Sequence, residues 1–245
     1  MRTLKLTIAY DGTNYAGWQR QSNALAVQQV MEEAFAHLTD GVAPTISGAG
    51  RTDSGVHAAG QVASVNVSFD LSPISVQRAL NMRLPADIRV MDVTEVPLGF
   101  HAQFHAVSKH YRYRMITTPV MSPFDRQYAW HVPWPLDLGA MHDAAQALVG
   151  THDFASFQAI STKVVNTTRT LDRLSVTDVG GEIRIDAEGK GFLRNMVRIF
   201  AGTLMEVGAG QRSSAFIPEI LAARSREAAG KTAPPQGLTL VAVRY

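Results

Sequence analysis

The sequence GAGRTDSGVHA, residues 48–58, interrupts the regular elements of the first half of the chain and places three glycines around Arg51 and Asp53. Glycine tolerates positive φ and lets another backbone or a ligand approach closely, so this segment predicts a tight loop rather than a helix or a strand interior. A carboxylate held on such a loop, with a cation two residues away, is a candidate reactive group. The alternative is a polar hairpin in which Arg51 and Asp53 pair at the surface, and the segment alone does not decide between the two.

Elements with clear hydrophobic periodicity lie on both sides of this loop. Alternation of apolar residues predicts strands at residues 4–9, 63–69 and 88–93. Helical spacing predicts an amphipathic helix at residues 26–38, and the pair Ser72-Pro73 predicts the start of a second helix that runs to about residue 81. The first part of the chain is therefore expected to alternate strand, helix, strand, helix, strand.

The segment YDGTNYAGWQRQ, residues 10–21, separates the first strand from the first helix and predicts a second loop. Its aromatic residues Tyr15 and Trp18 could stack on nucleic-acid bases. Large aromatic side chains are mostly buried in proteins, however, so we favour a role in which the two rings cap the core.

The second half repeats this order of elements without repeating the residues. Its predicted strands are 107–116, 171–177, 183–187 and 238–245, and its predicted helices are 138–149, 192–207 and 216–223. This alternation predicts the α/β (α+β) class, with two α/β halves that meet at a cleft and helices that cover one face of each sheet.

Composition excludes several classes of protein. The chain has 245 residues, of which 46% are apolar and 18% charged, which argues against disorder. It contains no cysteine, so disulfides, thiolate zinc sites and cysteine nucleophiles are excluded. The net charge of +2 permits an anionic partner without requiring one. No secretion signal and no long apolar run is evident, so we expect a cytoplasmic protein.

Basic and aromatic residues alternate most densely in FHAQFHAVSKHYRYR, residues 100–114. On the predicted strand, Lys109 and Tyr111 share one face and Arg112 and Arg114 share the other, together with His110. Such faces suit a phosphate backbone and stacked bases, or else an edge strand with solvated arginines. His101 and His105 are four residues apart, but no third ligand is evident, so a metal pair is disfavoured.

The predicted helix GFLRNMVRIFAGTLMEVG carries Arg194 and Arg198 one turn apart, beside a buried stripe that includes Leu193. A partly desolvated arginine requires an anionic partner, which is either a structural carboxylate or part of a catalytic site. Other catalytic templates are not met, because the dinucleotide fingerprint, the phosphate loop, the HExxH motif and the G-x-S-x-G elbow are all lacking from the sequence.

An ordered set of segments resembles the tRNA pseudouridine synthase A family from about residue 8 to the C-terminus. They are YDGTNYAGWQRQ, GAGRTDSGVHAAGQV, LNMRLPADIRV, KHYRYR, GFLRNMVRIFAGTLMEVG and GLTLVAVRY. The resemblance implies isomerisation of uridine to pseudouridine in the anticodon stem-loop of tRNA, at the family's positions 38, 39 and 40. It also implies a homodimer that needs no cofactor and no metal. The implied fold has two similar halves, 1–104 and 105–245, around a continuous mixed, mainly antiparallel sheet with an active-site cleft between them.

The same resemblance assigns roles to individual residues. It implies Asp53 as the catalytic aspartate, Tyr111 as the tyrosine that contacts the target base and Arg198 as the partner of the aspartate. Arg51 is linked to base flipping, and Leu193 joins Tyr111 and Arg51 as a substrate contact. Further RNA contacts are expected at Gln103, Lys109, Arg112, Arg114, Lys163 and Arg169. Gln103 stands where the family often has arginine, and it cannot neutralise a phosphate.

Chemistry leaves two routes open for the aspartate. An ionised carboxylate beside C1′ can act as a nucleophile, or it can remove a sugar proton to give a glycal. The alternative function is a non-catalytic tRNA-binding or folding protein on the same scaffold. A glycan- or nucleoside-hydrolysing enzyme is a weaker option, because no second carboxylate is positioned for paired acid and base work.

Overall fold

The computed structural model describes residues 1–160 and 164–245, and these fall into two compact units. The first unit comprises Met1–Val107 and Leu240–Tyr245, and the second comprises Ser108–Thr239. The boundary near residue 107 lies close to the predicted division at 104/105, but the end of the final strand groups with the first unit and not with the second. Whether the two units act as separate domains stays a prediction.

The strands of the first unit follow the order β4-β1-β3-β10. These strands are β1 (Arg2–Tyr10), β3 (His57–Val67), β4 (Ile88–Val96) and β10 (Leu238–Arg244), and the short β2 (Ser47–Gly48) pairs with β3. Strand β1 is antiparallel to both of its neighbours. The alternating residues Leu4, Leu6 and Ile8 are fully buried, so the predicted apolar face is the face that packs in the core.

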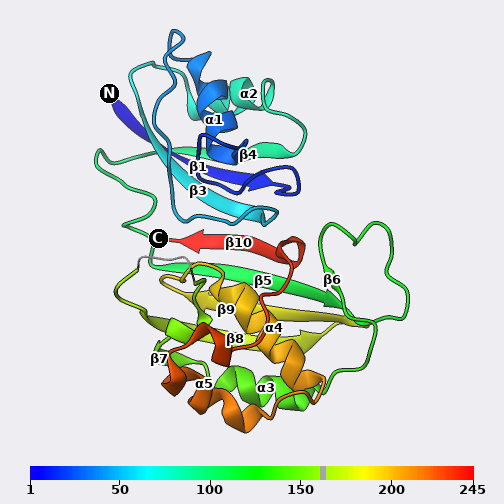
Figure 1. Ribbon diagram of the computed structural model, residues 1–245. Helices are drawn as coiled ribbons and strands as arrows, with labels where there is room; N and C mark the ends of the chain where they lie inside the picture. The colour runs from blue at the N-terminus through cyan, green and yellow to red at the C-terminus, as the bar shows by residue number, and fades with distance from the viewer. Residues whose placement is uncertain (161–163) are drawn as a thin grey trace. The chain divides into compact units, whose positions relative to one another are not determined.

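Two helices cover one side of this sheet (Figure 1). Helix α1 (Val27–Ala36) buries Val27, Met31 and Phe35, which recur at helical spacing. Helix α2 (Pro73–Asn81) begins where the sequence predicts, because the Ser72 side chain accepts a hydrogen bond from the Ser75 amide and Pro73 occupies the first turn.

The strands of the second unit follow the order β5-β9-β8-β7, with β6 beside β5. Strands β5 (Ser108–Ile116), β9 (Glu182–Gly189), β8 (Thr168–Asp178) and β7 (Gly150–Asp153) are antiparallel, and β6 (Trp130–His131) is parallel to β5. On β5 the side chains of Tyr111, Tyr113 and Met115 are buried, whereas those of Arg112 and Arg114 are only partly covered. The predicted alternation of the two faces is confirmed.

Helices α3 (Leu138–Gln146), α4 (Met196–Gly208) and α5 (Ile217–Ala223) pack on the second sheet (Figure 1). Short 3₁₀ turns lie at Ala155–Phe157, Ser214–Phe216, Arg226–Ala228 and Pro235–Gly237. The expected start of the long helix at residue 192 is wrong, because Asn195 adopts φ 64° and the helix begins at Met196. Arg194 therefore precedes the helix, and of the two arginines only Arg198 lies on it.

The predicted fold class is confirmed: helices pack on strands whose pairings are mainly antiparallel. The continuity of one sheet through both halves and the cleft between the halves stay predictions. Within the described parts of the chain, no helix combines the length and the apolar character needed to cross a lipid bilayer.

Candidate active site

The loop that carries Asp53 is held by hydrogen bonds from the loop at residues 10–21. The Trp18 amide donates to the Thr52 carbonyl oxygen at 3.2 Å, and the Gly55 amide donates to the Tyr15 carbonyl oxygen at 3.2 Å. The Tyr10 and Thr52 hydroxyl groups share a buried hydrogen bond of 2.8 Å. These contacts fix the backbone on both sides of Asp53, whose side chain is half-buried while that of Arg51 is exposed.

Glycine residues permit the close approach of the two loops. A Cβ atom on Gly17 would lie 2.2 Å from the Thr52 carbonyl oxygen, and one on Gly12 would lie 2.0 Å from the Val56 carbonyl oxygen. A Cβ atom on Gly48 would lie 2.4 Å from Nε1 of Trp18. The backbone of the Asp53 loop therefore takes the space that a side chain on the first loop would fill.

Two aromatic residues of the first loop belong to the core, as expected. Trp18 is 1% exposed and Tyr15 is 5% exposed. The Tyr15 hydroxyl donates to the carboxylate of Asp87 at 2.8 Å, so its polar end is satisfied. Both rings are buried and support the loop from within the core.

His57 closes the far end of the Asp53 loop. Its side chain is buried, and Nδ1 lies 3.0 Å from the Gly12 amide, which donates to it, and 3.1 Å from Oδ1 of Asp11. The amide of Val56 donates to the carbonyl oxygen of Asp53 at 3.1 Å and closes a turn over residues 53–56. Hydrogen bonds thus hold the loop at Thr52, at the turn over residues 53–56 and at His57.

Tyr111 lies on β5 of the second unit with 7% of its surface exposed. Its ring contacts the ring of Phe192 edge to face, with centroids 5.1 Å apart and an angle of 78° between the planes. Leu193, the next residue, is buried, and its amide donates to the sulfur of Met196 at 3.3 Å. The ring contact brings Tyr111 to the segment just before α4, in which Leu193, another predicted substrate contact, follows Phe192.

Arg198 lies in the first turn of α4 with its guanidinium held on two sides. Its Nε donates to the Ala233 carbonyl oxygen at 2.8 Å, and Nη1 donates to Oδ1 of Asn195 at 3.2 Å. Asn195 is one of the few non-glycine residues with positive φ, a conformation that asparagine tolerates better than most residues. The left-handed turn before α4 thus brings an acceptor to the predicted catalytic arginine.

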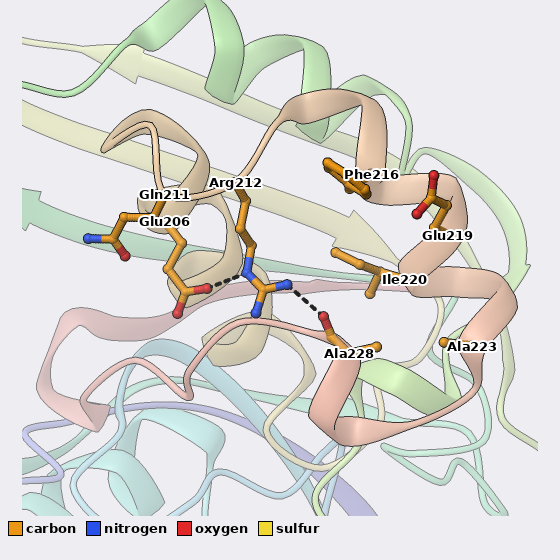
Figure 2. Close-up of a pocket in the computed structure, with 8 residues that line it drawn as sticks. All are labelled: Glu206, Gln211, Arg212, Phe216, Glu219, Ile220, Ala223 and Ala228. Carbon is orange, nitrogen blue, oxygen red and sulfur yellow. Dashed lines mark hydrogen bonds and ion pairs between the residues drawn. The ribbon is translucent and has the colours of Figure 1, made fainter.

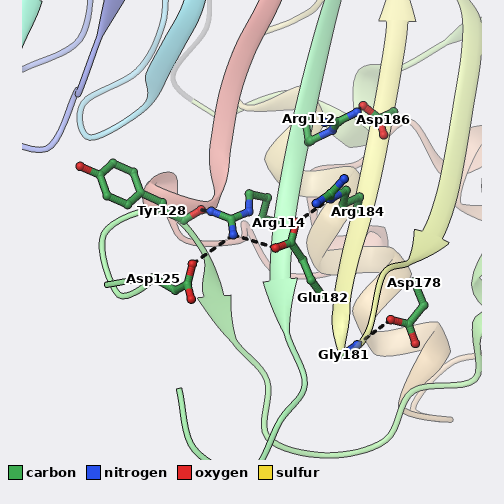
Figure 3. A network of polar contacts seen from close by, with 9 residues as sticks. All are labelled: Arg112, Arg114, Asp125, Tyr128, Asp178, Gly181, Glu182, Arg184 and Asp186. Carbon is green, nitrogen blue, oxygen red and sulfur yellow. Dashed lines mark hydrogen bonds and ion pairs between the residues drawn. The ribbon is translucent and has the colours of Figure 1, made fainter. Parts of the chain in front are cut away.

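Arg112 and Arg114 form ion pairs within the second unit (Figure 3). Nε of Arg112 lies 2.9 Å from Oδ1 of Asp186, and Nη2 of Arg114 lies 2.7 Å from Glu182 and 3.1 Å from Asp125. Hydrogen bonds from Arg114 and, to a smaller extent, from Arg184 lower the pKa of Glu182 from 4.5 to about 2. A phosphate that binds either arginine has to compete with a carboxylate already in place.

The other predicted RNA contacts differ in how they are held. Nζ of Lys109 donates to the Lys190 carbonyl oxygen at 3.4 Å, and burial lowers the pKa of Lys109. Arg169 donates from Nη1 to the carbonyl oxygens of Asn166 at 3.0 Å and Thr168 at 2.7 Å. The side chain of Gln103 is exposed on the first unit. Lys163 lies outside the described residues.

Comparison with known proteins identifies the family to which this chain belongs. The chain matches the family described as tRNA pseudouridine synthase over residues 6–105 and 144–245. It is 46% identical to the tRNA pseudouridine synthase A of Halalkalibacterium halodurans, over 97% of this chain and 90% of that protein. The chain belongs to the tRNA pseudouridine synthase family. Relatives from Geotalea daltonii (44% identical, 100% of both chains covered) and Syntrophotalea carbinolica (46% identical, 100% of this chain and 97% of that protein) carry the same description.

The predicted family and the predicted enzyme class, an isomerase, are therefore confirmed. Sequence reasoning singled out Asp53 but missed three side chains that hold its loop: Tyr10, Thr52 and His57. All three lie inside or next to the segments that carry the family resemblance. The family motifs could therefore have pointed to these residues. Residue spacing alone does not show that the hydroxyl groups of Tyr10 and Thr52 would join the first strand to the loop.

Figure 2 shows residues that line a hollow of about 710 Å³ on the second unit, and none of them is a predicted site residue. Nε of Arg212 lies 2.6 Å from Oε2 of Glu206, and Nη1 of Arg212 donates to the Ala228 carbonyl oxygen at 2.8 Å. The other oxygen of Glu206 accepts from the Lys231 amide at 2.9 Å. These bonds tie α4 to the segment after α5, so the polar groups of the hollow have a structural role.

No group of three or more His, Asp or Glu side chains that could hold a metal ion occurs in residues 1–160 and 164–245. In the pair weighed as metal ligands, Nδ1 of His105 accepts from the His101 amide at 2.9 Å, and Nδ1 of His101 accepts from the Gln103 amide at 3.2 Å. One ring nitrogen of each histidine is thus already used by the backbone.

Proposed function

We propose that the chain isomerises uridine to pseudouridine in the anticodon stem-loop of tRNA, at the family's positions 38, 39 and 40, and that Asp53 is its reactive carboxylate. Membership of the tRNA pseudouridine synthase family supports the reaction. The observation that carries the assignment of Asp53 is the bracing of its loop by Trp18, Tyr15 and Tyr10. A catalytic group must be held in a narrow range of positions, and a surface ion pair needs no such bracing.

The reaction breaks the N1–C1′ bond, turns the detached uracil and joins it again through C5. Asp53 acts in its ionised form, either as the nucleophile at C1′ or as the base that gives a glycal. Arg198 supplies the counter-charge in this proposal, and the hydrogen bonds that its guanidinium donates to Ala233 and Asn195 support that role because they orient it. Because both routes need a carboxylate, both fail when Asp53 loses its charge.

Tyr111 retains the uracil while it turns. An aromatic face attracts the base by stacking without fixing its rotation in the plane, and the edge contact from Phe192 keeps the tyrosine ring in position. The final step removes the proton from C5, for which the Tyr111 hydroxyl or a water molecule is the base. The target uridine has to leave its stack at a cost of a few kcal/mol, and the exposed Arg51 fills the gap or holds the phosphate.

Binding of tRNA rests on phosphate contacts in this proposal. Lys109 and Arg169 supply direct charge, Gln103 supplies a hydrogen bond, and Arg112 and Arg114 exchange a carboxylate for a phosphate. The affinity should therefore fall steeply with salt. We further propose that the chain works as a homodimer in the cytoplasm, which sedimentation and fractionation would test.

Tritium release from tRNA labelled at uridine C5 tests the assignment. We expect Asp53→Ala to abolish release while tRNA binding persists, and Asp70→Ala, which removes an exposed carboxylate from the same unit, to act like the unchanged protein. Release that survives Asp53→Ala would remove Asp53 from the mechanism. A purified protein that binds tRNA but releases no tritium would favour the alternative, a non-catalytic tRNA-binding protein.

A further inference from the structure

An aromatic side chain outside the predicted site is unusually exposed. Phe104 lies between β4 and β5 in the first unit with 74% of its surface exposed. Its ring stacks on the ring of His101, with centroids 4.2 Å apart and 28° between the planes. A large apolar ring is normally buried, so one that stands in solvent with a second ring behind it requires an explanation.

The loop that presents this ring is held in one conformation. The amides of Gln103 and His101 donate to Nδ1 of His101 and of His105 respectively, which orients both imidazoles. The Tyr245 hydroxyl donates to the Ala102 carbonyl oxygen at 2.7 Å, and the Ala102 amide donates to Oγ of Ser64 at 3.1 Å. The stack is therefore preorganised, and little conformational entropy is lost when something binds to it.

The same loop packs against the start of the Asp53 loop. Ala102 shares a buried cluster with Ala49 and Val62, and Ala49 donates its amide to the Val62 carbonyl oxygen at 2.7 Å. Ala49 is four residues before Asp53 in the chain. The loop that carries Phe104 thus packs, through Ala102, against a residue at the start of the segment that carries Asp53.

The charge of the segment favours one kind of partner. Residues 97–107 contain two histidines and no Asp or Glu, so no carboxylate of this segment opposes a polyanion. The exposed amide of Gln103 lies next to the ring in sequence and can donate to a phosphate or a base edge. A flat ring in such surroundings matches an unpaired nucleobase, because every base has a π-face on which an aromatic side chain stacks.

We propose that the outer face of Phe104, supported by His101, stacks on an unpaired base of the RNA substrate next to the target uridine. The inference rests on the proposed function, because it takes RNA as the ligand of the first unit. Phe104 is a positioning residue in this scheme: it holds the RNA strand and touches none of the reacting atoms. Its removal should weaken binding and leave the chemical step unchanged.

Phe104→Ala tests this inference, with Phe104→Trp as the conservative variant and Phe124→Ala as the control. Phe124 is a phenylalanine of the second unit that is 87% exposed. With a fluorescently labelled anticodon stem-loop RNA, we expect Phe104→Ala to raise the Kd by at least about fivefold. Phe104→Trp should restore the Kd to within about twofold, and Phe124→Ala should leave it unchanged. Single-turnover rates at saturating RNA should be equal in all variants.

Two results would overturn the inference. One is a Phe104→Ala protein that binds the RNA as well as Phe124→Ala does. The other is a change in the sedimentation of Phe104→Ala without RNA, which would identify the ring as a contact between copies of the chain. The binding measurement needs no turnover, so a lack of tritium release by the unchanged protein would refute the proposed reaction and not the stacking.

Discussion

Replacing Gly17 with alanine tests whether the packing of the two loops holds Asp53 in place. The added methyl group would lie 2.2 Å from the Thr52 carbonyl oxygen and 3.0 Å from the carbonyl carbon of Asp53. Contacts of Cβ below 3.0 Å are essentially never found, so the backbone at Thr52 and Asp53 has to move by about 1 Å. That movement carries the carboxylate with it.

The chain offers a matched control for this change. Gly17 has φ +88° and Gly41 has φ +86°, but a Cβ on Gly41 would meet no atom within 4 Å. Both variants therefore carry the cost of a left-handed alanine, about 1–2 kcal/mol. Gly17→Ala adds the clash, which costs about 1–3 kcal/mol in a packed region. Since 1 kcal/mol shifts the Tm of a chain of this size by roughly 2–4 °C, both variants should remain folded at 25 °C.

Activity should separate the two variants where stability does not. A misplacement of about 1 Å can reduce a rate by about a hundredfold, so we expect kcat/KM for tritium release to fall by about that factor in Gly17→Ala and to stay within about twofold in Gly41→Ala. Circular dichroism melts show the temperature at which both are folded. Equal activity of the two folded variants would refute the argument that loop packing positions Asp53.

Three further predictions concern the second unit. Tyr111→Phe should lower turnover by about 10²–10⁴-fold with the Kd for tRNA unchanged, because the proposed base for the C5 proton is lost; near-normal turnover would leave the ring a stacking role alone. Asn195→Gly should keep the positive φ but release Arg198, so that turnover falls about three- to tenfold with little change in Tm; an unchanged rate would show that Asn195 does not orient the arginine. Because Arg114 and Arg184 together lower the pKa of Glu182 to about 2, the stability that this carboxylate contributes is fully present above about pH 4.5 and is lost as the pH falls through 2. Urea unfolding should therefore show Glu182→Gln to be less stable by up to about 3 kcal/mol at pH 7 and by almost nothing near pH 2, and a loss that is equal at both pH values would contradict this.

Local sequence signals predict most elements of the fold because these elements depend on interactions between residues that are close in the sequence. Ser72-Pro73 marks the start of α2 since the cap and the first turn depend on neighbouring residues alone. Burial of Tyr15 and Trp18 follows from the size of their rings. The short β7 at Gly150–Asp153 was missed, because a four-residue strand with polar side chains forms only through its pairing with β8.

The start of α4 shows a second limit of local signals. The apolar spacing continues back to Leu193, so the pattern predicts a helix that begins four residues too early. Asn195 instead takes the left-handed conformation, and its side chain bonds to Arg198. Such a turn is stabilised by its contacts in the folded protein rather than by residue preference, and positions of this kind cluster at functional sites.

The ion pairs of β5 give the arginines next to Tyr111 a structural role that does not depend on RNA: they help to fix the register of the strand. In the antiparallel pairing of β5 with β9, Arg112 stands opposite Asp186 and Tyr111 stands opposite Ala187. A slip of one residue would move every side chain of β5 to the other face and turn Tyr111 away from Phe192. The same slip would separate Arg112 from a carboxylate that is 7% exposed and leave its charge without this partner, at considerable cost. The ion pair between Arg112 and Asp186 thus disfavours the shifted register. Arg112, on one face of β5, therefore helps to keep Tyr111 on the other face.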